Sequence, residues 1–277
     1  MIIKKSAAEI EAIAASGRIL ARCHRLLRGK ARAGVTTAEL DRAAERFIRS
    51  QGAEPVFKGY RGFPGSICAS PNSMVVHGIP GPYRLARGDV LSIDIGVLFE
   101  GWVADAAVTL PIGPVTAVAR GLLVTTRAAL FEAIAQCRAG NRLGDVSAAV
   151  QRRVEADGLS VIRSLVGHGV GRDMHEDPQI PNFGRTGTGP ELEQGMVFAI
   201  EPMVNAGGHD VRLGKDKWAV YSQDGSLAAH FEHTVAITAD GPRILTPWHD
   251  HEDPARSEAG ASMSTPAGSA AGGRSER

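Results

Sequence analysis

The chain has 277 residues, of which 43% are hydrophobic and 22% are charged, and its formal net charge is +1. A near-neutral chain without a basic run gives no electrostatic reason to expect nucleic acid as a partner. The N-terminus lacks the apolar stretch and the cleavage site of a signal peptide, and no uninterrupted run of 18 apolar residues could span a membrane. We therefore expect a cytoplasmic protein that binds neither nucleic acid nor membranes.

The predicted elements follow the order helix, helix, strands, and this order occurs twice. A capping box at Ser6 and Glu9 begins a long first helix, and a second capping box begins a helix that ends at Gly52. Strand-like runs follow up to Leu110. After the breaker PIGP, the chain predicts helices at about 116–137 and 143–157, and then strands up to about residue 238.

Two ten-residue windows indicate an internal duplication. LARGDVLSID (85–94) and LEQGMVFAIE (192–201) share the pattern L-x-x-G-x-V-x-x-I followed by an acid. They occur at the same stage of both halves, so we expect Asp94 and Glu201 at related positions. Two helices and several strands in each half predict an α+β fold with antiparallel strands, in which helices cover one face and the other face is free for a site.

The C-terminal segment differs from the rest of the chain. Residues 250–277 are rich in Ser, Ala, Gly and Pro and have no hydrophobic periodicity. We predict a single folded domain over 1–249 and a disordered, low-complexity tail over 250–277.

The stretch VLSIDIGVLFEGWVADAAVTL (90–110) alternates like two strands around a turn, yet it places two carboxylates inside the strands. If the turn is centred on Phe99 and Glu100, Asp94 lies directly opposite Asp105, with the two Cβ atoms ~4.5–5.5 Å apart on one face. Like charges at that distance repel. A solvated edge position would explain either aspartate alone, whereas the pair suggests a cation between them.

Three further residues complete a candidate metal site. His168 lies in the glycine-rich segment SLVGHGVGRDMHEDP, Glu201 ends an apolar strand, and Glu232 begins the last predicted strand. Each has a structural explanation of its own, such as a loop histidine bonded to backbone or a charge at a strand end. Together, four carboxylates and one imidazole suit two divalent ions such as Mn, Fe, Co or Zn. We expect the histidines outside these motifs, His24, His209, His249 and His251, on the surface.

Five segments in this order resemble the methionine aminopeptidases and the wider pita-bread metallopeptidase family: SIDIG, GWVADAAVT, GHGVGRDMHEDP, IEPM and FEHTVAIT. The segment GSICASPNSMVVHGIP narrows the resemblance to the type I enzymes, and the similarity runs from about Ile2 to Thr246. It implies the pita-bread fold, in which two pseudo-two-fold halves form a curved antiparallel sheet with helices on the outer face and a dinuclear metal site on the inner face.

The resemblance also implies residue roles. Asp94 would chelate one metal ion, His168 and Glu201 would bind the other, and Asp105 and Glu232 would bridge the two ions. Glu201 would also move protons for the attacking water, His77 would contact the substrate near the scissile amide, and His175 would donate to its carbonyl. The implied methionine pocket is lined by Tyr60, Phe63, Cys68 and Trp218. The chain departs from the type I pattern at Met174, where an aromatic residue is usual, and at His230, where Gln is common.

The implied function is metal-dependent removal of the initiator methionine when the second residue is small, by a monomer that acts on nascent N-termini, including those at the ribosome. One alternative is an Xaa-Pro aminopeptidase or prolidase, but these usually carry an additional N-terminal domain, and only about 75 residues precede the His77 motif. Type II enzymes usually have a helical insertion, for which the 33 residues from His168 to Glu201 leave little room. A non-catalytic pita-bread binding protein would typically lose ligands, and this chain keeps all five.

Overall fold

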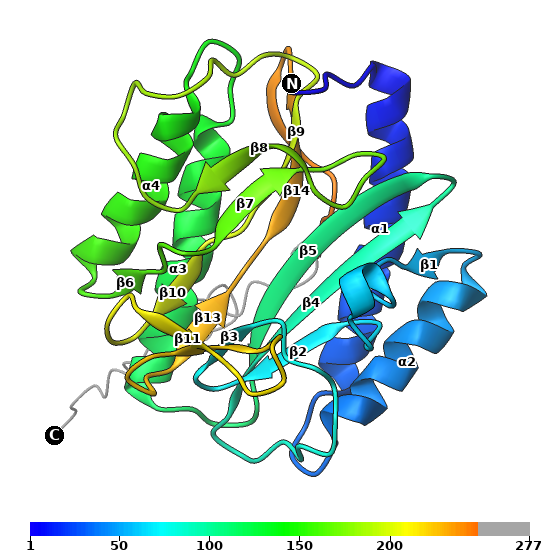
Figure 1. The fold of residues 1–277 in the computed structure, drawn as a ribbon, viewed down its shortest axis with the longest axis vertical. Coiled ribbons are helices and arrows are strands. Elements are labelled where there is room, and N and C mark those ends of the chain that lie inside the picture. Colours follow the sequence, from blue (N-terminus) through cyan, green and yellow to red (C-terminus); the bar gives the residue numbers. More distant parts are fainter. Residues whose placement is uncertain (249–277) are drawn as a thin grey trace, which may run out of the picture. The chain divides into compact units, whose positions relative to one another are not determined.

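The helices occur in two consecutive pairs, as the repeated sequence pattern predicts (Figure 1). The computed structural model describes residues 1–248, and residues 1–247 form one compact unit. Within it lie the α-helices α1 (Ala7–Lys30), α2 (Thr37–Ser50), α3 (Ala117–Gln136) and α4 (Leu143–Ala156). The capping boxes at the starts of α1 and α2 are present, so the predicted starts of both helices are confirmed. None of these helices combines the length and apolar composition needed to cross a lipid bilayer.

The strands that follow the first helix pair are β1 (Glu54–Pro55), β2 (Cys68–Pro71), β3 (Met74–Val76), β4 (Val90–Phe99) and β5 (Trp102–Pro111), with a 3-10 turn, η1 (Tyr60–Gly62), after β1. Those that follow the second pair are β6 (Ser160–Val161), β7 (Val166–Gly169), β8 (Glu176–Pro181), β9 (Val197–Ile200), β10 (Met203–Asn205), β11 (Val211–Leu213), β12 (Val220–Ser222), β13 (Ala228–His230), β14 (His233–Thr238) and β15 (Gly241–Ile244). The predicted order of helices and strands is confirmed in both halves.

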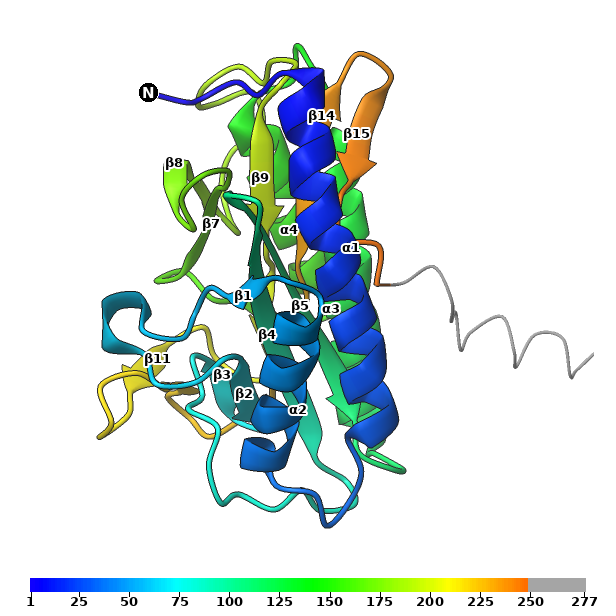
Figure 2. The same cartoon turned by 90° about the vertical axis from the view of Figure 1, so that its right-hand side faces the viewer.

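The strands pair antiparallel throughout the described residues, which confirms the α+β class. One sheet has the order β1-β4-β2, with β5 also paired to β4, and another has the order β15-β14-β9-β7-β8. Two smaller sheets, β13-β10-β6 and β11-β12-β3, complete the set. The helices lie on one side of the long strands (Figure 2), so the other side is free to carry the site.

The register of the β4–β5 hairpin differs from the prediction by two positions. Its turn residues are Glu100 and Gly101, both with positive φ (50° and 76°), and not Phe99 and Glu100. A two-residue turn of this kind requires left-handed backbone at both positions, which glycine adopts without strain. Asp94 therefore pairs with Ala107, and Asp105 pairs with Gly96. Because the shift is even, both carboxylates keep the same face and become diagonal neighbours.

Two smaller expectations were wrong. β14 is not the last strand, because β15 pairs with it despite Pro242. Proline is tolerated there because β15 lies at the edge of its sheet. His24 is not on the surface: it lies on the buried face of α1, with its Nε2 2.9 Å from the carbonyl oxygen of Ala106. The domain boundary at residue 249 and the tail over 250–277 fall outside the described residues.

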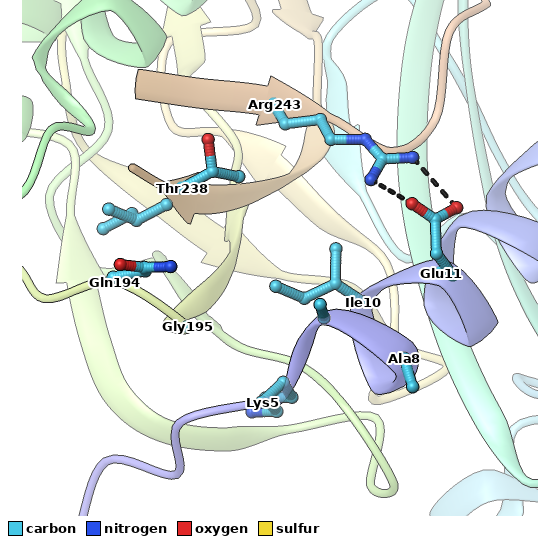
Figure 3. A pocket seen from close by; sticks show the side chains of 10 residues that line it. Lys5, Ala8, Ile10, Glu11, Gln194, Gly195, Thr238 and Arg243 are labelled. Carbon is cyan, nitrogen blue, oxygen red and sulfur yellow. Dashed lines mark hydrogen bonds and ion pairs between the residues drawn. The ribbon is translucent and has the colours of Figure 1, made fainter. Parts of the chain in front are cut away.

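The start of α1 is tied to the second half of the chain. Lys5 forms a buried ion pair with Glu176, and Arg243 of β15 donates to both carboxylate oxygens of Glu11. Between these two contacts lies a mainly apolar cavity of about 320 Å³, lined by residues of α1, β14 and β15 such as Ile10 (Figure 3). Further along, α1 passes against the backbone that follows β15.

Gly17 permits that close approach, because a Cβ at this position would lie 2.0 Å from the carbonyl oxygen of Leu245. We expect Gly17→Ala to lower the free energy of unfolding by about 1–3 kcal/mol through overpacking. The matched control is Gly29→Ala on the same helix, where the added Cβ meets nothing within 4 Å. That variant should gain up to about 1 kcal/mol from helix propensity. Urea unfolding of both variants checks the prediction, and equal effects would contradict it.

Candidate metal centre

One pocket collects every site residue that the sequence predicts. Its volume is about 290 Å³. Asp94 and Asp105 reach it from the middle of β4 and β5, His168 from β7, Glu201 from the residue after β9, and Glu232 from the residue before β14. The other predicted residues on its wall are Tyr60, Phe63, Cys68, His77, His175 and Trp218.

The ligand atoms are close enough to share an ion. One ligand atom each from Asp105, His168 and Glu232 lies within 4.8 Å of the others. His168 Nε2 is 3.8 Å from Asp105 Oδ2 and 3.7 Å from Glu201 Oε1. Its Nδ1 lies 2.8 Å from the carbonyl oxygen of Gly169, an acceptor, so in the neutral ring Nδ1 carries the hydrogen and the Nε2 lone pair faces the carboxylates. Histidines that bind a metal ion through one ring nitrogen commonly donate a hydrogen bond from the other nitrogen, which orients the ring.

Two threonines bond the backbone of pocket residues across the two halves of the chain. Thr234 accepts a hydrogen bond from the backbone N–H of Asp105 (3.0 Å) and donates to its carbonyl oxygen (2.8 Å). Thr109 does the same for His230, at 2.9 and 2.8 Å. Between them, the N–H of Glu232 donates to the carbonyl oxygen of Ala107 at 2.9 Å. We call these two paired contacts the threonine clamps; they fix β5 against residues 230–234.

Burial makes the carboxylate cluster electrostatically costly. It raises the pKa of Asp94 from its ordinary 3.8 to about 7 and that of Glu201 from 4.5 to about 7. Burial, and then the neighbouring carboxylates, raise the pKa of Asp105 and of Glu232 well above the ordinary range. Within residues 1–248, Oδ1 of Asp94 and Oδ1 of Asp105 have no hydrogen-bond partner. Buried oxygens of this kind fit hard divalent cations, which satisfy them and offset their repulsion.

Two histidines lie beside the cluster. The His175 ring lies tilted at 43° against the His168 ring with centroids 4.2 Å apart, and its Nδ1 is 2.9 Å from the hydroxyl oxygen of Tyr60. His77 has left-handed backbone (φ 59°), a strained conformation for a non-glycine residue. Burial lowers the pKa of both rings to about 4, so both are neutral at pH 7.

The remaining wall is apolar and polarizable. Phe63 meets Trp218 edge-on, with centroids 5.2 Å apart, and Cys68 pairs with Asp94 across β2 and β4. Burial raises the pKa of the Cys68 thiol well above its usual value, so it stays protonated. Met174, the departure from the type I pattern, is also buried on this wall.

His230 belongs to the site in the structure, although the sequence suggested only that it lies near the pocket. Its side chain is 2% exposed, and its Nε2 is 3.5 Å from Glu201 Oε2 and 3.9 Å from Glu232 Oε2. Burial lowers the pKa of the ring. A sequence feature that could have indicated this position is that His230 lies two residues before Glu232, a spacing typical of residues on the same face of a strand.

An antiparallel α+β fold with carboxylates and imidazoles clustered in one pocket defines a metal-dependent hydrolase as the class of protein. The chain belongs to metallopeptidase family M24, whose family model matches residues 11–239. This family uses divalent metal ions, and the Asp105, His168 and Glu232 cluster could bind one.

Methionine aminopeptidases of several bacteria are similar to most of the chain. A methionine aminopeptidase of Clostridium perfringens is 50% identical over 246 residues, which are 89% of this chain and 99% of that protein. Methionine aminopeptidase 1 of Mycobacterium tuberculosis is 46% identical over 253 residues, 89% of this chain and 95% of that protein.

Solved structures share the fold. A methionine aminopeptidase from Thermotoga maritima has a TM-score of 0.88 and 42% identity, and the match covers 89% of this chain and 99% of that one. A prolidase from Pyrococcus horikoshii has a TM-score of 0.72 and 22% identity, and the match covers 89% of this chain but 64% of that one. The prolidase likeness shows the fold alone.

The raised pKa values predict how the metal-free protein responds to pH. The folded state binds more protons than the unfolded state between the ordinary and the raised pKa of Asp94 and Glu201. The free energy of unfolding should therefore fall as pH rises from about 4 to about 7. Divalent ions bind only the folded site and should remove this loss.

The measurement is Tm between pH 5 and pH 8, in chelator and with added Mn²⁺. An Asp94→Asn, Asp105→Asn double variant is the control: it should show a flatter pH dependence and a much smaller Tm increase with Mn²⁺. A wild-type Tm that does not respond to chelator at pH 7.5 would argue against a clustered ion site.

Proposed function

We propose that this protein is a metal-dependent aminopeptidase that removes the N-terminal methionine from proteins and peptides when the second residue is small. The observation that carries the proposal is the apolar slot of Phe63, Cys68 and Trp218 directly beside the carboxylate cluster. An unbranched thioether suits such a polarizable slot. The similarity to named methionine aminopeptidases, at 50% and 46% identity, supports the same conclusion.

The five predicted ligands, Asp94, Asp105, His168, Glu201 and Glu232, are proposed to hold two divalent ions. When bound, such ions polarise the scissile carbonyl and lower the pKa of water toward ~7. Glu201 is also proposed as the proton carrier for the attacking water, because its carboxylate faces the same pocket, with Oε1 3.7 Å from His168 Nε2.

His175 is proposed to donate a hydrogen bond to the oxygen of the scissile carbonyl. When the Tyr60 hydroxyl donates to Nδ1 of the neutral ring, Nε2 carries the hydrogen and can donate it. A donor that binds the developing oxyanion more strongly than the carbonyl acts on the transition state. His77 is proposed to contact the substrate near the scissile amide, and the two rings would leave room at the second residue for little beyond a methyl or hydroxymethyl group.

The setting of the reaction is part of the proposal. The substrates are proposed to be the N-termini of newly made chains, met in the cytoplasm and at the ribosome, and the enzyme is proposed to act as a monomer. Light scattering of the purified protein tests the oligomeric state, and co-sedimentation with ribosomes tests the association.

A competition among Met-Ala-Ser, Met-Leu-Ser, Leu-Ala-Ser and Ala-Pro-Ala tests the specificity. Met-Ala-Ser should be cleaved fastest. Met-Leu-Ser should be cleaved hardly at all, because a branched second residue meets the two histidines, and a steric clash discriminates far more than the ~1–3 kcal/mol of one methylene. Preference for Ala-Pro-Ala would assign the function to the prolidase side of the family. No cleavage of any peptide with metal supplied would favour a binding protein.

His175→Ala should lower kcat about 10²–10³-fold with little change in KM, the usual cost of removing an oxyanion donor. Tyr60→Phe removes the hydrogen bond to Nδ1 and keeps the ring, so it should lower kcat by a smaller factor. Steady-state kinetics with Met-Ala-Ser checks both, and metal content is measured in parallel. A rise in KM alone for His175→Ala would reassign that residue to substrate binding.

A further inference from the structure

Like His168, His230 places an imidazole nitrogen beside the carboxylate cluster. His168 Nε2 is 3.7 Å from Glu201 Oε1, and His230 Nε2 is 3.5 Å from Glu201 Oε2. An imidazole nitrogen therefore lies near each oxygen of Glu201. The spacing of His230 to Glu232, 3.9 Å, is also like that of His168 to Asp105, 3.8 Å.

The backbone of His230 is held as firmly as that of the predicted ligand Asp105. One threonine clamp holds each of them, with the hydroxyl bonded to both the N–H and the carbonyl oxygen. The clamps are reciprocal: Thr109 lies four residues after Asp105 and holds His230, while Thr234 lies four residues after His230 and holds Asp105. Strand β5 and the segment 230–234, which joins the end of β13 to β14, therefore each present one site residue and hold the site residue of the other.

The ring nitrogens of His230 are buried without a hydrogen bond in the described part of the chain, although Nε2 lies near Glu201 and Glu232. Neither Nδ1 nor Nε2 has a hydrogen-bond partner among residues 1–248, although the side chain is 2% exposed. A buried polar atom without a partner is costly, and most such atoms in native proteins are bonded to protein, water or an ion. The neighbouring carboxylates point to a cation as the partner of Nε2.

We infer that His230 is a further metal ligand, which binds through Nε2 an ion that Glu201 and Glu232 also contact. The inference rests on the proposed function only in that both need the same metal site. A second imidazole changes the donor set from one nitrogen to two, and imidazole favours Co²⁺, Fe²⁺ and Zn²⁺ over Mn²⁺. His230 therefore shifts the selectivity of the site away from Mn²⁺.

The experiment counts coordinated imidazoles in the full chain loaded with Co²⁺. Paramagnetic Co²⁺ shifts the ring proton signals of a coordinating histidine far from their usual NMR positions, and its ring N–H signals disappear in D₂O. Wild type should give signals from two rings, and His230→Gln from one. Titrations should show Co²⁺ binding at least tenfold weaker in His230→Gln, with a smaller loss for Mn²⁺.

The matched control is His233→Gln. His233 lies three residues further along, packs against Phe131 with ring centroids 5.8 Å apart, and contacts Thr246. This variant should keep both ring signals and bind Co²⁺ within twofold of wild type. Tm of the metal-free variants shows whether they fold, and if His230→Gln does not, the wild-type count of rings decides alone.

Signals from a single ring in wild type, or unchanged Co²⁺ binding in folded His230→Gln, would overturn the inference and leave the proposed function intact if Met-Ala-Ser is still cleaved. Signals from two rings without cleavage of any peptide would support His230 as a ligand and overturn the proposed function instead. A wild-type chain that binds no Co²⁺ would overturn both.

Discussion

Repulsion among four carboxylates, three of them buried and Glu201 half-buried, is the constraint on which the rest of the structure depends. Asp94, Asp105, Glu201 and Glu232 share one pocket, and burial there disfavours their charged forms. Left to itself, such a cluster would spread apart or take up protons. The β4–β5 hairpin, strand β7 and the clamped segment before β14 keep it together. The metal-free carboxylate cluster therefore lowers the stability of the fold, and cations that bind to it restore that stability.

The threonine clamps show how the fold holds the mutually repelling carboxylates in place. Side-chain hydroxyls bond the backbone of the opposite strand at Asp105 and at His230, in positions where a continuous sheet would have used backbone alone. Ser92 lies 2.8 Å from the Thr109 hydroxyl, whose own hydrogen goes to His230, so Ser92 is the donor. The hydroxyls of Thr109 and Thr234 therefore both donate and accept hydrogen bonds between β5 and residues 230–234. These bonds hold the backbone of Asp105 and His230 in place.

Much of this could be predicted from the sequence, because the strongest signals are local. The capping boxes locate the starts of α1 and α2, and carboxylates inside apolar strands locate Asp94 and Asp105. The hairpin register was wrong because the choice between two adjacent turns depends on left-handed backbone at Glu100 and Gly101. Contacts between distant residues, such as Tyr60 with His175, leave no local pattern at all.

His230 lies between these two cases. Its alternation with Glu232 was visible in the sequence, but its meaning depends on distances to Glu201 that only the fold supplies. Met174 is similar: the sequence shows that an aromatic wall is absent, and the structure shows that the replacement is buried in the pocket. The sequence shows that a residue differs from the type I pattern, but the chemical consequence of that difference depends on the neighbours of the residue in the fold.

The split of the proposed ligands between the two halves has a consequence for how metal binding and folding are linked. Asp94 and Asp105 come from one local hairpin, whereas His168, Glu201 and Glu232 come from the second half of the chain. During synthesis the first half is made first, and its two aspartates are still solvated. Closure of the second half expels that water and creates the repulsion that a cation relieves. Because the site residues meet only when both halves are in place, metal binding is coupled to folding of the whole domain, and the metal-free protein should be less stable than the metal-bound one.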